Sequence, residues 1–185
     1  MTFLEAQTEL AELLLDTSTE FSVAGTKNKK CINRAYEYMY DTLKHSEKVK
    51  RRMKISKTEV SFSNKVGALP ANFDTVDIVS IFDFKTESEL DGLSDDRYYD
   101  FEVRGERGAK SMYIQSEETK LYISYIPLRT DLAADSEKFL LPEELHTCLI
   151  DFAIFQYNRM IRDMGEAANA LQLANAILND KLATL

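Results

Sequence analysis

The stretch Leu141-Pro142-Glu143-Glu144-Leu145 decides the fold, because it predicts the start of a long helical region that extends to Leu185. Proline fits the first position of a helix, and the helix dipole favours glutamates in the first turn. Two apolar runs at helical spacing follow, and the second begins at Glu166, directly after Gly165. The apolar positions are Leu145, Cys148, Leu149, Phe152, Ala153, Phe155, Met160, Ile161, Met164, Ala167, Ala170, Leu171, Ala174, Ile177, Leu178 and Leu182. Faces this apolar must be covered by the rest of the chain or by another subunit.

The length and composition of the chain are those of a soluble globular protein. Its 185 residues suffice for one generous domain, or one domain with an insertion. Cys31 and Cys148 fall on apolar helical faces, so we expect buried free thiols and no disulfide. The acidic N-terminal segment lacks the features of a signal peptide, and no apolar run approaches the ~20 residues of a membrane span. We therefore expect a protein made in a reducing cytoplasm, without a membrane partner.

The charge is strongly segregated along the chain. Residues 27–57 carry eleven Lys and Arg against three acids, whereas residues 72–102 carry ten Asp and Glu against two bases. The first twenty residues hold five acids and no base, and the whole chain has a net charge of −8. A chain divided in this way can present complementary patches to copies of itself. The alternative interpretation is that these charges belong to solvated faces that happen to cluster along the chain and contact no partner.

Helices are expected at the N-terminal end as well. Thr2 and Glu5 have the spacing of a capping box, which predicts a helix to about Asp16. A second helix is expected from Lys27 to about His45. Its apolar stripe consists of Cys31, Ile32, Ala35, Tyr36, Met39 and Leu43.

The middle of the chain changes to strand patterns. Val60 and Phe62 alternate with polar residues, and apolar residues dominate 76–84 after a turn-like Leu69-Pro70. Alternating runs at 98–104, 110–115 and 120–126 are separated by two predicted hairpins, at Gly105–Gly108 and around residues 117–119. The order of elements predicts an α+β fold. In it, residues 1–49 and 128–185 form a helical bundle, and residues 50–127 form an inserted antiparallel β-domain.

The sequence lacks the motifs of common catalytic, phosphate-binding and metal-binding sites. There is no phosphate-binding glycine loop and no nucleophile elbow, and His45 and His146 lack metal-ligand spacing. A predicted loop holds the acids Glu87, Glu89, Asp91, Asp95 and Asp96. It lacks the Asp/Asn alternation of a calcium-binding loop, so a solvated loop is favoured over a metal site. The sequence therefore predicts neither an enzyme nor a cofactor.

The basic run Lys48–Lys54 has three interpretations: a nucleic-acid contact, a patch that faces a partner, or a solvated loop.

Several short motifs resemble those of one known family. They are Asn33-Arg34-Ala35-Tyr36-Glu37-Tyr38, Ala68-Leu69-Pro70-Ala71-Asn72-Phe73-Asp74 leading into Val76–Ile81, Leu121-Tyr122-Ile123-Ser124-Tyr125-Ile126-Pro127, and the Leu141-Pro142-Glu143-Glu144 helix. Taken together, about residues 28–180 resemble the head-to-tail connector (adaptor, or head-completion) proteins of tailed double-stranded DNA phages.

The resemblance implies a structural function in the virion. Such proteins form a ring, commonly twelvefold, under the portal, and the genome passes through its centre. The implied partners are the phage portal protein, neighbouring copies in the ring, tail or neck proteins, and genomic DNA that passes without sequence-specific binding. The implied location is the virion neck, after synthesis in the host bacterial cytoplasm.

The charged segments and the C-terminal end are the candidate interface between subunits or with the portal. The candidate residues are Lys48, Lys50, Arg51, Arg52, Lys54, Glu87, Glu89, Asp91, Asp95, Asp96, Leu178, Lys181, Leu182 and Leu185. Two alternatives remain from the sequence: a tail-completion or terminator protein of the same virion, and a small cytosolic regulator with an acidic metal site.

Overall fold

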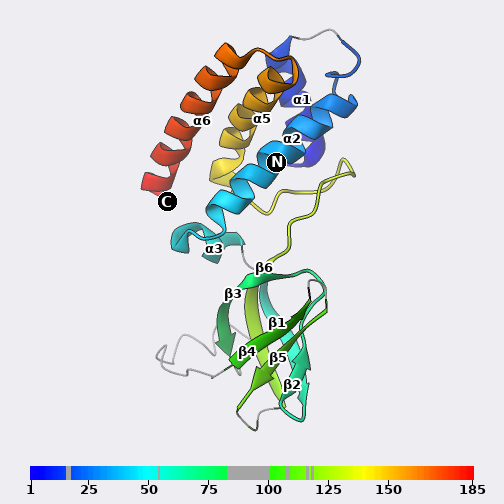
Figure 1. The fold of residues 1–185 in the computed structure, drawn as a ribbon, viewed down its shortest axis with the longest axis vertical. Coiled ribbons are helices and arrows are strands. Elements are labelled where there is room, and N and C mark those ends of the chain that lie inside the picture. The colour runs from blue at the N-terminus through cyan, green and yellow to red at the C-terminus, as the bar shows by residue number, and fades with distance from the viewer. Residues whose placement is uncertain (16–17, 54, 83–100, 107–108, 116, 118) are drawn as a thin grey trace. The chain divides into compact units, whose positions relative to one another are not determined.

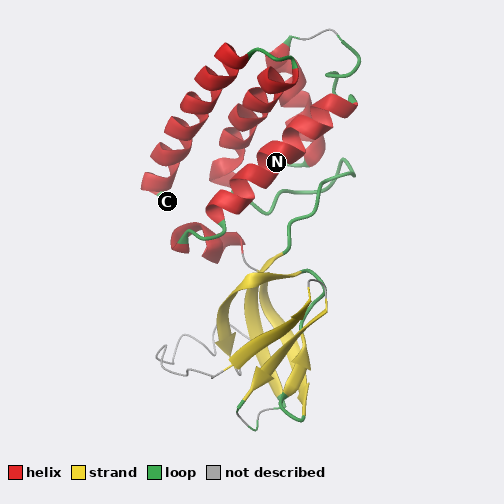
Figure 2. Cartoon of the chain, viewed as in Figure 1, coloured by secondary structure: helices red, strands yellow, loops and turns green. Residues whose placement is uncertain are grey.

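The computed structural model describes residues 1–15, 18–53, 55–82, 101–106, 109–115, 117 and 119–185. The chain divides into two compact units. The helical unit comprises Met1–Arg52 and Arg129–Leu185, and the sheet unit comprises Met53–Leu128 (Figure 1, Figure 2). Helices from both chain ends and an antiparallel sheet between them confirm the predicted α+β class. That residues 1–49 with 128–185, and residues 50–127, form separate domains stays a prediction.

The helical unit is built around α5 (His146–Met160). This helix packs against α1 (Phe3–Leu14), α2 (Thr26–Leu43) and α6 (Met164–Thr184) (Figure 1). Phe3, Leu10, Ile32, Tyr36, Met39, Leu149 and Phe152 are buried in its core. The large apolar side chains are thus removed from water in one cluster, which supplies the main free energy of folding.

The N-terminal helix begins with the predicted capping box. The backbone N–H of Glu5 donates to Thr2 Oγ1 at 3.3 Å, and the N–H of Thr2 donates to Glu5 Oε2 at 2.7 Å. These two hydrogen bonds satisfy backbone donors that the helix itself leaves free.

The C-terminal region differs in detail from the prediction. Residues Glu143–Leu145 form a 3₁₀ turn, η1, before α5 begins, and Pro142 precedes that turn. The break between α5 and α6 lies at residues 161–163, where Arg162 has a φ of 66°. The side chain of Asp163 then accepts a hydrogen bond from the N–H of Glu166 at 3.0 Å. Gly165 therefore lies within the first turn of α6, because the Asp163 cap fixes the helix start two residues earlier than expected.

The basic run is helical. Residues Glu47–Met53 form the short helix α3, in which Val49 is buried. The described part of Lys48–Lys54 is therefore a helix and not a loop, and a contact of this run with a partner or with nucleic acid stays a prediction.

The sheet unit contains a six-stranded sheet in the described residues, with the strand order β3-β6-β1-β2-β5-β4. Every neighbouring pair is antiparallel. The strands are β1 (Ile55–Ser63), β2 (Val66–Ala68), β3 (Phe73–Phe82), β4 (Phe101–Glu106), β5 (Ala109–Ile114) and β6 (Lys120–Pro127). Alternate side chains of β1, β5 and β6 form the buried cluster, which includes Val60, Phe62, Met112, Ile114, Leu121 and Ile123.

One predicted hairpin is present and one is not. β4 and β5 pair with each other, with Glu106 opposite Ala109, as the Gly105–Gly108 turn predicts. The hairpin expected around residues 117–119 is wrong, because β5 pairs with β2 and β4 while β6 pairs with β1 and β3. The unpredicted β2, three residues long, forms a hairpin with β1 that separates β5 from β6. A strand this short has no alternation for sequence analysis to detect.

Candidate interaction surfaces

Two candidate cations of α3 contact other elements of the helical unit, Lys48 at the C-terminal end of α6 and Arg52 at η1. Lys48 Nζ donates to the carbonyl oxygen of Leu182 at 3.4 Å, and Arg52 Nη1 lies 2.6 Å from Glu144 Oε1. The last carbonyls of a helix lack internal partners and carry the negative end of the helix dipole. Lys48 and Arg52 therefore both have partners within the helical unit. The side chains of Lys50 and Arg51, and all of Lys54, lie outside the described part of the chain.

The four candidates near the C-terminus lie at the C-terminal end of α6. Leu178 is buried, whereas Lys181, Leu182 and Leu185 are half-buried. The structure thus brings Lys48 together with this group, whereas Arg52 pairs with Glu144 of η1.

The acidic candidates Glu87, Glu89, Asp91, Asp95 and Asp96 lie outside the described residues. Pairing of the basic and acidic segments between subunits therefore stays a prediction.

Side chains of α2 form hydrogen bonds with the backbone of residues 132–140, the segment before η1. Asn33 Nδ2 donates to the carbonyl of Leu132 at 3.0 Å, while Asn33 Oδ1 accepts from the Leu132 N–H at 2.8 Å. The Tyr36 hydroxyl accepts from the Leu140 N–H at 3.1 Å. Burial raises the pKa of Tyr36 to about 12, so this hydroxyl stays neutral well above neutral pH. Two residues of the motif that carried the family resemblance therefore hold residues 132–140 against the bundle.

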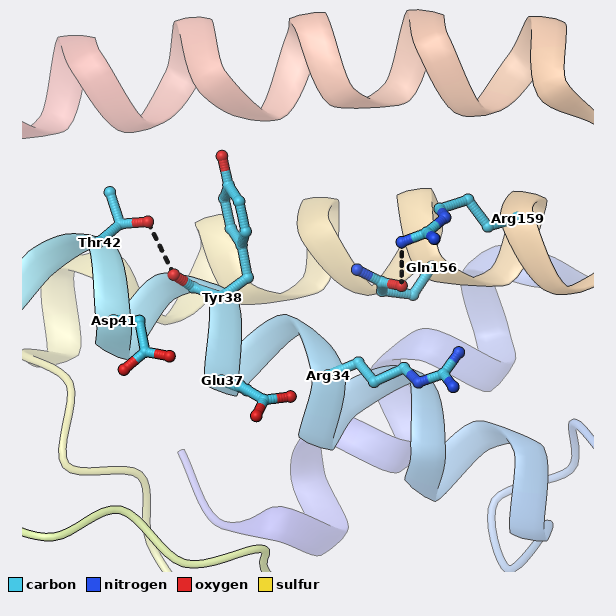
Figure 3. Close-up of a pocket in the computed structure, with 7 residues that line it drawn as sticks. All are labelled: Arg34, Glu37, Tyr38, Asp41, Thr42, Gln156 and Arg159. Atoms are coloured by element: carbon cyan, nitrogen blue, oxygen red, sulfur yellow. Dashed lines mark hydrogen bonds between the residues drawn. The ribbon is translucent and has the colours of Figure 1, made fainter.

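A hollow of about 490 Å³ lies on the α2–α5 side of the helical unit (Figure 3). It is lined by Arg34, Glu37, Tyr38, Asp41, Thr42, Gln156 and Arg159. The Tyr38 ring lies against that of Phe152, with 4.9 Å between the ring centroids, and remains 40% exposed. Sequence analysis missed the hollow, although Tyr38 lay off the apolar stripe of its helix.

The hollow is lined by two arginines and two acids, and among the described residues only the acids have ion-pair partners. Glu37 pairs with Arg129 at 3.3 Å, and Asp41 pairs with Lys44 at 3.0 Å. Arg34 has no ion pair with any described residue, and Arg159 has only a 3.5 Å hydrogen bond to the Gln156 amide and a stacking contact on Phe155. The end of the hollow that holds the two guanidinium groups is therefore the positively charged end.

The two cysteines and the possible metal ligands of the described residues are not arranged for chemistry. Cys31 and Cys148 are buried free thiols, as predicted. Burial raises the pKa of Cys31 to about 12 and also raises that of Cys148, so both are poor nucleophiles. Among the described residues, no three His, Cys, Asp or Glu side chains are grouped so that they could hold a metal ion.

None of the helices in the described ranges combines the length and the apolar character that crossing a membrane requires.

One protein-family model covers nearly the whole chain. The family model described as SU10 adaptor protein matches residues 1–184. No curated protein matches the chain. The family match extends over the helical unit and the sheet unit alike.

Proposed function

Since the chain belongs to the SU10 adaptor protein family, a family of phage head–tail adaptors, we propose that it forms a ring in the phage neck between portal and tail. The observation that carries this proposal is the family match over residues 1–184. In this role the protein acts by shape and by contacts, and its location is the virion.

A ring requires two different faces on each subunit. In a cyclic assembly one face of a subunit meets another face of the next, so the interface is heterologous. The segregated charges of the chain support such an arrangement, with +8 in residues 27–57 and −8 in residues 72–102. The ring is proposed to be a dodecamer, as is common in head-to-tail connectors.

The proposed contact with the portal or with a neighbouring subunit involves α3 and the end of α6. The exposed position of Lys48 and Arg52, and the partly exposed Leu182 and Leu185, support a contact there. On this proposal the partners are the portal protein, neighbouring copies, and the tail or neck proteins that dock beneath the ring.

DNA is proposed to pass through the ring without being bound specifically. Each subunit has a net charge of −8, so the summed charge of the ring repels phosphates. An acidic channel wall would let the genome slide during ejection.

Binding to purified capsids that contain the portal tests this function. Labelled protein should co-sediment with such capsids and should not co-sediment with capsids assembled without the portal. Reversing the charges of Lys50, Arg51 and Arg52 should impair this binding. Equal binding to capsids with and without the portal would contradict the proposal.

A further inference from the structure

Exposed large apolar side chains of the described residues fall into two groups and one isolated residue. The first group is on and just after α1: Leu4, Leu13 and Leu15. The second group lies on α2 and around the α5–α6 turn: Tyr38, Ile161 and Met164. Leu173 on α6 is the isolated one. Apolar side chains that gather on a surface among charged ones are typical of contacts with another protein.

The charged side chains of α1 itself are all acids, although Glu5 also lies near Lys138 and the N-terminal ammonium group. Glu5, Glu9 and Glu12 have i, i+4, i+7 spacing, which places them on one face of the helix. Neither α1 nor Leu15 after it contributes a basic residue. We define the acidic face as these three glutamates with Leu13, which lies one turn after Glu9, and Leu15, which follows the helix.

The second group lies among exposed cations, together with the exposed acids Asp163 and Glu166 around the α5–α6 turn. Cys31 Sγ lies 3.6 Å from Met160 Sδ, which places the first turns of α2 beside the end of α5. We define the basic face as the cations around this contact with their exposed apolar neighbours. It consists of Lys30, Arg34, Arg159, Arg162, Tyr38, Ile161 and Met164.

The basic face has uncompensated charge. None of its four cations forms an ion pair with a residue that the structure describes, whereas Glu37 and Asp41 at the rim of the hollow have Arg129 and Lys44 as partners. An exposed cation without a partner costs little in a monomer and is available to a carboxylate of another molecule.

We propose that the acidic face of one subunit docks on the basic face of the next, so that Glu9 and Glu12 lie at the positive end of the Arg34–Arg159 hollow. This inference rests on the proposed ring. The occupant is a second copy of this chain, because the two faces match in charge and each presents exposed apolar side chains. The pairing is heterologous, as a closed ring requires.

Duplex DNA fits the basic face less well. A phosphate backbone in the hollow would approach the carboxylates of Glu37 and Asp41, which line it together with Arg34 and Arg159. The exposed Ile161 and Met164 would also gain little from contact with phosphates.

A charge swap tests the pairing. The basic-face variant is R34E/R159E and the acidic-face variant is E9K/E12K; Glu5 is kept because it forms the capping box. The control variants R104E/K120E and E106K/E117K change the net charge equally through exposed residues of the sheet unit. Circular dichroism and thermal unfolding establish that each variant is folded.

Self-association is measured by sedimentation velocity at rising protein concentration and by ring occupancy on portal-bearing capsids. Each single-face variant should associate about tenfold or more weakly than the wild type, because like charges then face each other. An equimolar mixture of the two variants should recover association, since each supplies the complement that the other lacks. Both control variants should behave as the wild type.

Other results overturn the inference. Full association of both single-face variants, or no recovery in the mixture, would show that these faces do not meet. Loss of duplex DNA binding by the basic-face variant with unchanged association would assign that face to DNA. A wild type that binds capsids while the single-face variants bind equally well refutes the pairing and leaves the adaptor function intact. A wild type that self-associates in neither setting also refutes it.

Discussion

Asn33 on α2 forms two hydrogen bonds with the backbone of Leu132, 99 residues later in the chain. The carboxamide satisfies both the N–H and the carbonyl of Leu132, in the segment that leads back into the bundle before α5. A buried backbone group that loses its partner carries its full desolvation cost. The Asn33 side chain therefore joins two segments of the helical unit that are far apart in the sequence.

Replacing Asn33 should destabilise the protein. We expect Asn33→Ala to lower the free energy of unfolding by about 1–3 kcal/mol, because two backbone groups of Leu132 lose their partners. Urea denaturation measures the change. Asn169→Ala, at an exposed position of α6, is the matched control and should change stability by no more than about 0.5 kcal/mol. Equal stability of Asn33→Ala and the wild type would show that the carboxamide does not hold this segment.

Two glycines should respond to alanine in opposite ways. A Cβ at Gly67 would lie 2.6 Å from Val60 Cγ1 and 2.9 Å from Phe62 Cε1, in the buried cluster of the sheet. Gly67→Ala should therefore destabilise the sheet unit by about 1–3 kcal/mol. A Cβ at Gly165 meets nothing closer than 3.7 Å, so Gly165→Ala should stabilise α6 by up to about 1 kcal/mol. Thermal unfolding of both variants checks this, and a stabilised Gly67→Ala would contradict the packing.

Alkaline pH should unfold the protein partly through Tyr36. Burial raises the pKa of Tyr36 from 10.0 to about 12, so the folded state favours the neutral hydroxyl. The stabilisation that the neutral Tyr36 hydroxyl contributes is complete below pH 10 and is lost as the pH rises from 10 to about 12. The unfolded chain releases this proton at a lower pH than the folded protein does, so deprotonation favours unfolding.

Tyr36→Phe should make the loss of stability over this pH range less steep. It should also lower stability at neutral pH, because the Leu140 N–H loses its acceptor. Urea titrations at a series of pH values measure both effects. Tyr38→Phe, at an exposed position, should keep the pH dependence of the wild type. An unchanged slope in Tyr36→Phe would count against the role of Tyr36.

The helical unit should fold without the sheet unit. Its residues, Met1–Arg52 and Arg129–Leu185, contain a core of their own around α5. A chain in which a flexible Gly/Ser linker replaces residues 53–128 should show cooperative thermal unfolding and a helical circular dichroism spectrum. Leu149→Ala in this shortened chain should lower its stability by about 2–5 kcal/mol. A non-cooperative transition would mean that the units are not independent domains.

Local signals in the sequence predicted much of the fold. The capping box at Thr2 and the helical spacing from Cys31 to Leu43 predicted α1 and α2, because these patterns depend on neighbours within one or two turns. The sequence predicts the break between α5 and α6 near Gly165, whereas the Asp163 cap starts α6 at Met164. Helix ends are set by single capping contacts, so they are less certain than the helices themselves.

Non-local features were harder to predict. The alternation of β5 and β6 predicted strands but not their partners, because alternation specifies a buried face and not a neighbour. The hollow requires Arg34 and Arg159, which are far apart in the sequence and meet only because α2 packs on α5. The intramolecular partners of Lys48 and Arg52 depend on the same long-range packing.

Electron microscopy of particles made without this protein tests the central claim most directly. If the chain is a ring subunit of the neck, particles that lack it should lose their DNA and should not carry tails, and the wild-type chain supplied in trans should restore both. Particles that keep their DNA and join tails normally in its absence would contradict this account.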